Sequence, residues 1–524
     1  MSAPIVKTKY GILKGTVVQN VEGGKYLAFN GIPYAEPPVG QLRFKEPQPP
    51  KAWSGIRDAQ KEGSAAIQLN ILSSTNEITG SEDCLYLNVS TNSLSGKRAV
   101  IVWIHGGGFW TGCGSNDFYG PDYLLKHDVV VVSINYRLHI FGFLNVDDKD
   151  AAGNQGLKDQ VAALKWVQEN IEVFGGDSRN VTICGQSAGS ACVHYLTMSP
   201  LAKGLFHKAI GQSGCALNNW AYTTNNKEDV LHLVKILGLE TTDTKKAVQL
   251  LQTVDAVTML EALIKLVGGP AMMFSKIIFK PSLDEKSENC FLPQPPNEMA
   301  MKGIEVPSII GYDSHEGILF LREATDETLS AVEKDFDELF DRLIFNQNLK
   351  KTDDIIKIVR KYYFGDDPIT LAQFQNYLRI TGDMRIVNGI RRLVGFQLEK
   401  RVPMYFYIFS AQVEKSWTKF WLKYSGEGTC HGEEIDCIFY NRAFSSKLEP
   451  NSKNRVSMNR LTRLWTNFAK TGDPTPNLDN VITKKWLPVT KQEVNYLEIK
   501  EDLITGVNPD QDKWQFLKSI YDSA

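Results

Sequence analysis

The sequence predicts an α/β fold with a large, mostly parallel central sheet and helices on both of its faces. Residues 98–104 and 129–136 are continuously apolar rather than alternating, as expected for strands buried on both faces. Apolar side chains then recur at helical spacing from residue 156 to residue 174, before the apolar run at 181–184. Strand, helix and strand in this order form a crossover unit, which places its strands in parallel.

The amino-terminal part predicts an antiparallel meander that precedes the parallel strands. Residues 5–16 and 26–34 read as short strands interrupted by glycine, and Pro37 and Pro38 then exclude regular structure. Residues 85–89 form the next expected strand. A further helix is expected at residues 119–127, between the two continuously apolar runs.

Two long insertions, residues 216–300 and 320–402, are more polar and mainly helix-like. Insertions between the core strands of such a sheet usually build over its carboxyl edge, where ligands bind. We therefore expect them to form the walls or lid of a binding site. The helices expected within them span residues 228–237, 244–252 and 329–345, and the sheet resumes at residues 306–311 and 403–410.

Composition indicates which classes of partner and which cellular compartment to expect for the protein. The chain has 524 residues, of which 43% are hydrophobic and 23% charged, and its formal net charge is −2. This balance argues against nucleic acid or an acidic membrane surface as a partner, and no apolar run is long enough to span a bilayer. The first residues lack the apolar run of a secretory signal, and the eight cysteines show no paired spacing. We therefore expect a cytoplasmic protein with reduced thiols.

A serine in the sequence Gly185-Gln-Ser187-Ala-Gly189 follows the predicted strand 181–184. The Gly-x-Ser-x-Gly pattern is common by chance, but a strand before it and a helix after it are the context of a nucleophile elbow.

A second motif, His105-Gly-Gly-Gly-Phe109, directly follows the predicted strand 98–104. Its glycines free backbone N–H groups to point at one spot, as an attacked carbonyl oxygen requires, and the N–H of Ala188 would complete this oxyanion hole.

A serine nucleophile needs a base, normally a histidine oriented by a carboxylate. His431 stands out among the eight histidines because it lies in a loop after a late predicted strand, between Cys430 and Gly432. For the acid, residues beyond the strand at 306–311 offer Asp313 and Glu316, and spacing alone does not separate them. Neither has a metal-like partner set.

These motifs together resemble the type-B carboxylesterase/cholinesterase family, and most closely its arthropod intracellular carboxylesterases. The resemblance covers nearly the whole chain and rests on residues 29–44, 81–88, 105–109, 135–137, 154–160, 185–189 and 471–474. It implies one α/β-hydrolase domain over residues 1–524, although length alone would suggest two or more domains. It also implies nucleophile Ser187, acid Glu316, base His431, an oxyanion hole of Gly107, Gly108 and Ala188, an acyl-pocket tryptophan at Trp220, and no metal or cofactor.

Three departures from the family pattern bear on substrate and compartment. Residues 54–83 contain no tryptophan, so cation–π capture of a quaternary ammonium is not expected there and acetylcholine is not the expected substrate. Residues 60–75 contain no cysteine to bridge Cys84, which fits a reduced compartment. Gln186 stands where many members have glutamate; glutamine there is also a mark of juvenile hormone esterases, and we expect it to affect substrate binding.

The sequence thus predicts a serine esterase that hydrolyses neutral, fairly apolar carboxylic esters through an acyl-enzyme on Ser187. A role in detoxification or lipid-ester turnover, with organophosphates as covalent inhibitors, follows from the resemblance. The alternatives are a juvenile hormone esterase and a sequestering protein with slow turnover. A catalytically silent scaffold of the same fold is disfavoured because every triad position is filled.

Overall fold

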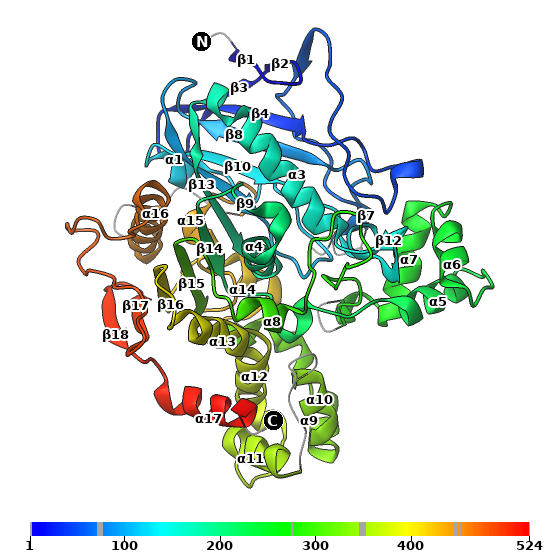
Figure 1. The fold of residues 1–524 in the computed structure, drawn as a ribbon. Coiled ribbons are helices and arrows are strands. Elements are labelled where there is room, and N and C mark those ends of the chain that lie inside the picture. Colours follow the sequence, from blue (N-terminus) through cyan, green and yellow to red (C-terminus); the bar gives the residue numbers. More distant parts are fainter. Residues whose placement is uncertain are drawn as a thin grey trace.

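The centre of the fold is an 11-stranded sheet, which the computed structural model describes within residues 3–70, 77–273, 276–344, 353–444, 448–449 and 452–522 (Figure 1). Its neighbours run parallel from β10 to β17 and antiparallel at both edges. The predicted mostly parallel sheet is therefore confirmed. In spatial order its strands are β18 (Ile504–Val507), β17 (Asn495–Ile499), β16 (Met404–Phe409), β15 (Ser308–Asp313), β14 (Lys208–Gln212), β13 (Gly176–Gln186), β9 (Arg98–Ile104), β10 (Val130–Ile134), β8 (Tyr86–Thr91), β4 (Lys25–Pro33) and β3 (Thr16–Gln19).

Both faces of this sheet are covered, which explains its continuously apolar strands. In β9, Val100 and Val102 face one buried cluster, whereas Ile101 and Trp103 face another on the opposite side. Helices α3 (Gln155–Asn170) and α4 (Ala188–Met198) pack on β13. They lie on the face of the sheet that is nearer the viewer in Figure 1. Helix α16 (Lys453–Thr471) contributes to the second cluster and contacts β9 and β13. Helices therefore flank both faces, as in the α/β-hydrolase fold.

The amino-terminal meander is antiparallel, as predicted, but it does not all belong to the main sheet. Strands β3, β4 and β8 pair antiparallel at one edge. Strands β1 (Ile5–Lys7) and β2 (Ile12–Lys14) pair with each other and, through β2, with β5 (Ile56–Asp58) in a separate three-stranded sheet. The break falls at Gly15, where a side chain would collide with Phe29 and with the carbonyl oxygen of Ala28.

The two insertions are helical, and the second differs from its prediction in one place. The helix expected at 329–345 is two helices, α9 (Asp326–Lys334) and α10 (Phe336–Ile344); residue 345 lies outside the described residues. Asp335 breaks the run because its backbone leaves the helical region and its carboxylate accepts a hydrogen bond of 3.0 Å from the N–H of Glu338. It thereby caps α10 instead of continuing α9. The other helices of the insertions are α5 (Lys227–Ile236), α6 (Thr244–Leu251), α7 (Ala256–Val267), α8 (Pro296–Ala300), α11 (Asp353–Phe364), α12 (Phe374–Gly382) and α13 (Asn388–Gln397).

The remaining elements are short, apart from the carboxyl-terminal helix. None of the eight cysteines, all within the described residues, forms a disulfide. In the part of the chain that the structure describes, no helix has the length and apolarity needed to cross a membrane. The short helices are α1 (Asp122–Leu125), α2 (His139–Phe143), α14 (Trp417–Leu422) and α15 (Ile435–Ile438), and the carboxyl-terminal helix is α17 (Gln511–Asp522). The short strands are β6 (Gln68–Leu69), β7 (Ile78–Thr79), β11 (Asn145–Asp148) and β12 (Ala151–Ala152).

A buried ion pair between Arg137 and Asp159 links two of the sequence motifs, residues 135–137 and residues 154–160. Arg137, which follows β10, donates from Nη2 to Asp159 Oδ1 at 2.7 Å and from Nε to Asp159 Oδ2 at 2.8 Å. Both side chains are almost fully buried, and the backbone N–H of Arg137 also donates to the same carboxylate at 3.1 Å. This bidentate pair fixes the loop after β10 to helix α3.

We predict that Arg137→Met lowers the free energy of unfolding by about 3–5 kcal/mol, because it leaves the Asp159 carboxylate buried without its partner. Urea denaturation measures the change. Lys9→Met is the control: Lys9 pairs with Glu169 on the surface, and its loss should cost about 1 kcal/mol or less. Equal losses of unfolding free energy in the two variants would contradict a stabilising role for the buried Arg137–Asp159 pair.

Candidate active site

Ser187 lies at a sharp turn between the end of β13 and the start of α4. Its backbone has φ 57° and ψ −123°, a conformation that residues other than glycine rarely adopt. A side chain at Gly189 would come within 2.1 Å of the Ile104 carbonyl oxygen, and one at Gly185 within 2.4 Å of the Gly189 carbonyl oxygen. The glycine spacing is therefore a steric requirement of the turn.

The triple-glycine loop after β9 packs directly against this turn. A side chain at Gly106 would come within 3.1 Å of Ser187 Cβ, and one at Gly107, where φ is +107°, within 2.0 Å of the Thr111 carbonyl oxygen. Gly107 and Gly108 line the same cavity as Ser187. Within the described residues, the N–H groups of Gly107, Gly108 and Ala188 donate to no protein acceptor. These donors are thus free to receive a ligand oxygen.

His431 and Glu316 meet although 115 residues separate them. His431 Nδ1 lies 2.5 Å from Glu316 Oε2, and both side chains are buried. The other oxygen of Glu316 accepts a hydrogen bond of 2.9 Å from the backbone N–H of Asp313. The carboxyl group of Asp313 instead accepts from the N–H of Gly432 at 2.7 Å. The geometry therefore pairs His431 with Glu316 and not with Asp313, an alternative that sequence spacing left open.

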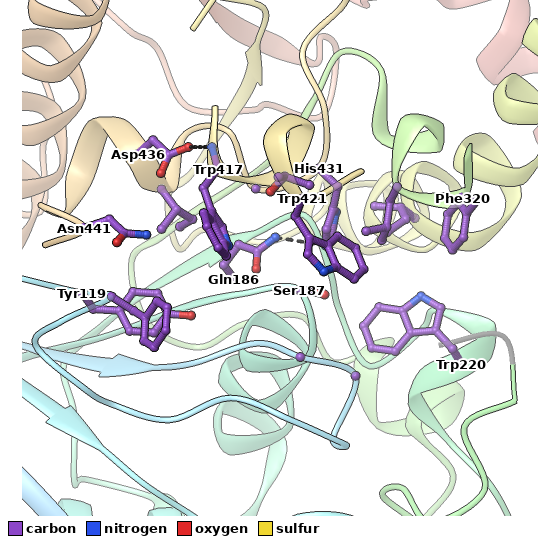
Figure 2. A pocket seen from close by; sticks show the side chains of 18 of the residues that line it. Tyr119, Gln186, Ser187, Trp220, Phe320, Trp417, Trp421, His431, Asp436 and Asn441 are labelled. Carbon is purple, nitrogen blue, oxygen red and sulfur yellow. Dashed lines mark hydrogen bonds between the residues drawn. The ribbon is translucent and has the colours of Figure 1, made fainter. Parts of the chain in front are cut away.

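The other ring nitrogen of His431 faces Gln186. Gln186 Nε2 lies 3.0 Å from His431 Nε2, as the dashed line in Figure 2 shows. Ser187 Oγ, in contrast, has no hydrogen-bond partner among the described residues, although Ser187, Gln186 and His431 line one cavity. In this arrangement Gln186, and not Ser187, is the hydrogen-bond partner of His431 Nε2.

Large aromatic side chains surround Ser187 in this cavity of about 210 Å³ (Figure 2). Trp220, predicted from the sequence, lines it, and its Nε1 donates to the Arg385 carbonyl oxygen at 2.8 Å. Trp417 and Trp421 on α14 were not predicted. Their spacing of four residues places them on one face of a helix, so helical periodicity could have found them if the short α14 had been recognised. The insertions and α14 therefore contribute to the walls, together with other segments that supply Tyr119 and Asn441.

Among the described residues that line the cavity there is no lysine or arginine, and Asp436 is the one carboxylic acid. Asp436 Oδ2 accepts a hydrogen bond of 2.7 Å from the backbone N–H of Trp417. Burial raises the pKa of Asp436 to about 8, so this carboxyl is largely protonated at neutral pH. No group of His, Cys, Asp and Glu able to hold a metal ion is found among the described residues.

Comparison with known proteins gives matches over almost the whole chain. A model of the carboxylesterase family matches residues 2–517. The chain is 34% identical to juvenile hormone esterase of Tribolium castaneum, over 99% of this chain and 93% of that protein. It is 35% identical to esterase FE4 of Myzus persicae, over 94% of this chain and 87% of that protein. The crystal structure of juvenile hormone esterase from Manduca sexta with OTFP covalently attached matches with a TM-score of 0.87 at 27% identity, covering 99% of this chain and 100% of that chain.

We predict that Ser187→Gly stabilises the protein by about 1 kcal/mol. It relieves backbone strain of about 1–3 kcal/mol, against an entropic cost of glycine of about 0.5–1 kcal/mol. Ser187→Ala removes the same hydroxyl but keeps Cβ, so it should bring no such gain. Urea denaturation of the two variants measures the difference, and equal stabilities would show that the turn is unstrained.

Proposed function

The chain belongs to the carboxylesterase family and is a carboxylic-ester hydrolase, and from this premise we propose that it works through an acyl-enzyme on Ser187. One observation carries the proposal. A serine held at a strained turn shares a cavity with the free N–H groups of Gly107 and Gly108 and with His431, whose ring is paired with Glu316. Nucleophile, oxyanion donors and oriented base are the parts that two-step acyl transfer requires.

In the first step, His431 Nε2 takes the hydroxyl proton of Ser187 while Oγ attacks the ester carbonyl carbon. Because Gln186 donates to Nε2 at rest, this contact must break before the proton moves. The N–H groups of Gly107, Gly108 and Ala188 stabilise the negative charge that develops on the carbonyl oxygen. His431 then protonates the alcohol, which leaves the acyl group on Ser187.

In the second step, water attacks the acyl carbon as His431 accepts a proton from it. The bond between this carbon and Ser187 Oγ then breaks, His431 returns the proton to Oγ, and the acid is released. Glu316 accepts a hydrogen bond from Nδ1 throughout, which keeps the Nε2 lone pair toward the cavity and stabilises the imidazolium that forms twice per cycle. We include residues 1–524 as one catalytic domain in this proposal, because the cavity is lined both by loops of the sheet and by the two insertions.

The substrates that fit this site are neutral, fairly apolar carboxylic esters. Its walls carry Trp220, Phe320, Trp417 and Trp421, and the carboxyl group of Asp436 is largely uncharged at neutral pH. Such a cavity favours apolar acyl or alcohol groups and offers little to an ion. Turnover of xenobiotic or lipid esters is the role that we propose, with organophosphates as covalent inhibitors of Ser187.

A second candidate is hydrolysis of juvenile hormone. Gln186 favours it, because glutamine before the nucleophile also marks juvenile hormone esterases, and relatives carrying that name match almost the full chain. A third possibility, sequestration, would use the same first step but a slow second one.

We predict that Ser187→Ala lowers kcat for nitrophenyl butyrate by about 10⁴-fold or more, since no other group replaces the nucleophile. An organophosphate should add its phosphoryl mass to the peptide containing Ser187 and to no peptide of the variant. Chromogenic assays and peptide mass spectrometry measure both effects. Residual turnover near the wild-type rate, or an adduct on another peptide, would refute the proposed nucleophile.

We predict that Trp220→Ala raises kcat/KM for nitrophenyl octanoate relative to acetate by about tenfold or more, because the shortened side chain makes room for a longer acyl group. Trp53→Ala is the matched control, since Trp53 does not line the cavity. A panel of acyl lengths that includes juvenile hormone measures the ratios. An unchanged octanoate-to-acetate ratio would show that Trp220 does not limit the acyl pocket. A kcat/KM for juvenile hormone far above that for the other esters would favour a juvenile hormone esterase. A burst followed by negligible turnover would indicate sequestration.

A further inference from the structure

Two buried carboxyl groups face each other behind the proposed base. Asp313 ends β15, Glu434 directly precedes α15, and both side chains are fully buried. The two side chains are close enough that each shifts the pKa of the other. Asp313 Oδ1 and Glu434 Oε2 have no donor among the described residues, whereas Asp313 Oδ2 accepts from Gly432 and Glu434 Oε1 accepts from Gln212 Nε2 at 3.2 Å. Each carboxyl therefore uses one oxygen for an ordinary hydrogen bond and has one left to face the other.

Two ionised carboxylates cannot form a hydrogen bond with each other, because neither carries a proton to donate. Burial and the neighbouring carboxyl groups raise the pKa of Asp313 and of Glu434. Of the groups that face them in the described part of the chain, His431 is the one that can become positively charged; Lys419 pairs with Glu433 instead. The titratable groups around the two are Glu316 after β15, His431 before α15, Tyr407 on β16, Cys184 on β13 and Cys437 on α15, with Glu433 and Asp436 beside Glu434.

Asp313 also contacts both arms of the His431–Glu316 pair. Its backbone N–H donates to Glu316 Oε1 at 2.9 Å, and its carboxyl accepts from the N–H of Gly432, the residue after His431. Gly432 has φ +82°, so its backbone conformation is one that few residues tolerate. A shift of the Asp313 carboxyl would therefore move His431 relative to Glu316.

We propose that Asp313 and Glu434 share a single proton and that this protonated pair positions His431 by holding the backbone of Gly432. The role in catalysis rests on the function proposed above for His431; the shared proton does not. Asp313 and Glu434 are positioning residues, since the proposal gives neither of them a contact with the substrate. When the shared proton leaves for solvent at alkaline pH, two carboxylates remain side by side in a buried site, and their repulsion loosens the contact with Gly432.

The shared proton has a consequence for stability that does not depend on catalysis. An unfolded aspartate or glutamate loses its proton at about pH 4, whereas the pair keeps one to a higher pH in the folded state. The folded protein therefore binds more protons over that interval, and its stability falls as pH rises. Asp313→Asn removes this dependence and preserves the contacts, because the amide oxygen accepts from Gly432 and the amide N–H donates to Glu434.

The test is the Tm of Ser187→Ala protein between pH 5 and 10, with and without Asp313→Asn. We expect the protein that carries Asp313→Asn to gain in Tm relative to its parent as pH rises. Glu434→Gln, which donates to Asp313 from the other side, should give the same trend and serves if Asp313→Asn does not fold. Glu82→Gln is the control: Glu82 pairs with Arg43 without a second carboxyl, and its Tm change should not vary with pH. A pH-independent difference for both Asp313→Asn and Glu434→Gln would overturn the shared proton.

The positioning role is tested separately in the active enzyme. Asp313→Leu removes the acceptor of Gly432 and should lower kcat by about 10²-fold with little change in KM. Asp313→Asn should recover most of this loss and decline less than the wild type at alkaline pH. Equal kcat values for the Leu and Asn variants would overturn the positioning role. If Ser187→Ala were as active as the wild type, the proposed function of Ser187 would be wrong. The Tm comparison would still test whether Asp313 and Glu434 share a proton.

Discussion

The close packing of the Ser187 turn against β9 is the constraint on which the rest of the site depends. Ser187 is held in its rare conformation because its N–H donates to the Gln212 carbonyl oxygen and Gly189 lies against Ile104. The same packing brings the triple-glycine loop, which follows Ile104, beside the serine. A side chain larger than hydrogen at Gly185 or Gly189 would separate β13 from β9 and scatter the proposed oxyanion donors.

Much of this arrangement could be predicted from the sequence because it depends on local sterics and periodicity. The continuous apolar run predicted β9, and the strand and helix on either side of the Gly-x-Ser-x-Gly motif predicted the turn at Ser187. Contacts between distant segments could not be predicted in this way. Spacing did not choose between Glu316 and Asp313, because the choice depends on how the loop of His431 packs. Trp417 and Trp421 were missed because α14 is one short helix in a long polar stretch, and the break at Asp335 depends on a side-chain cap.

The loop that carries His431 combines two kinds of support. Glu316 orients the ring directly, and the carboxyl group of Asp313 holds the adjacent backbone. Gln186, the residue before Ser187, adds a third contact to Nε2 of His431. His431, the proposed base, is thus held on three sides, and only the Gln186 contact must break for the proposed proton transfer. Under the proposed mechanism, Gln186 therefore affects the rate as well as the choice of substrate.

A crystal structure of the protein after reaction with a phosphonate ester tests the central claim most directly. The account predicts phosphorus bonded to Ser187 Oγ, with one phosphonyl oxygen about 2.7–3.1 Å from the N–H groups of Gly107, Gly108 and Ala188. It also predicts that His431 Nε2 has left Gln186 and faces the adduct. Phosphorus on another residue, or a phosphonyl oxygen turned away from those three N–H groups, would contradict it.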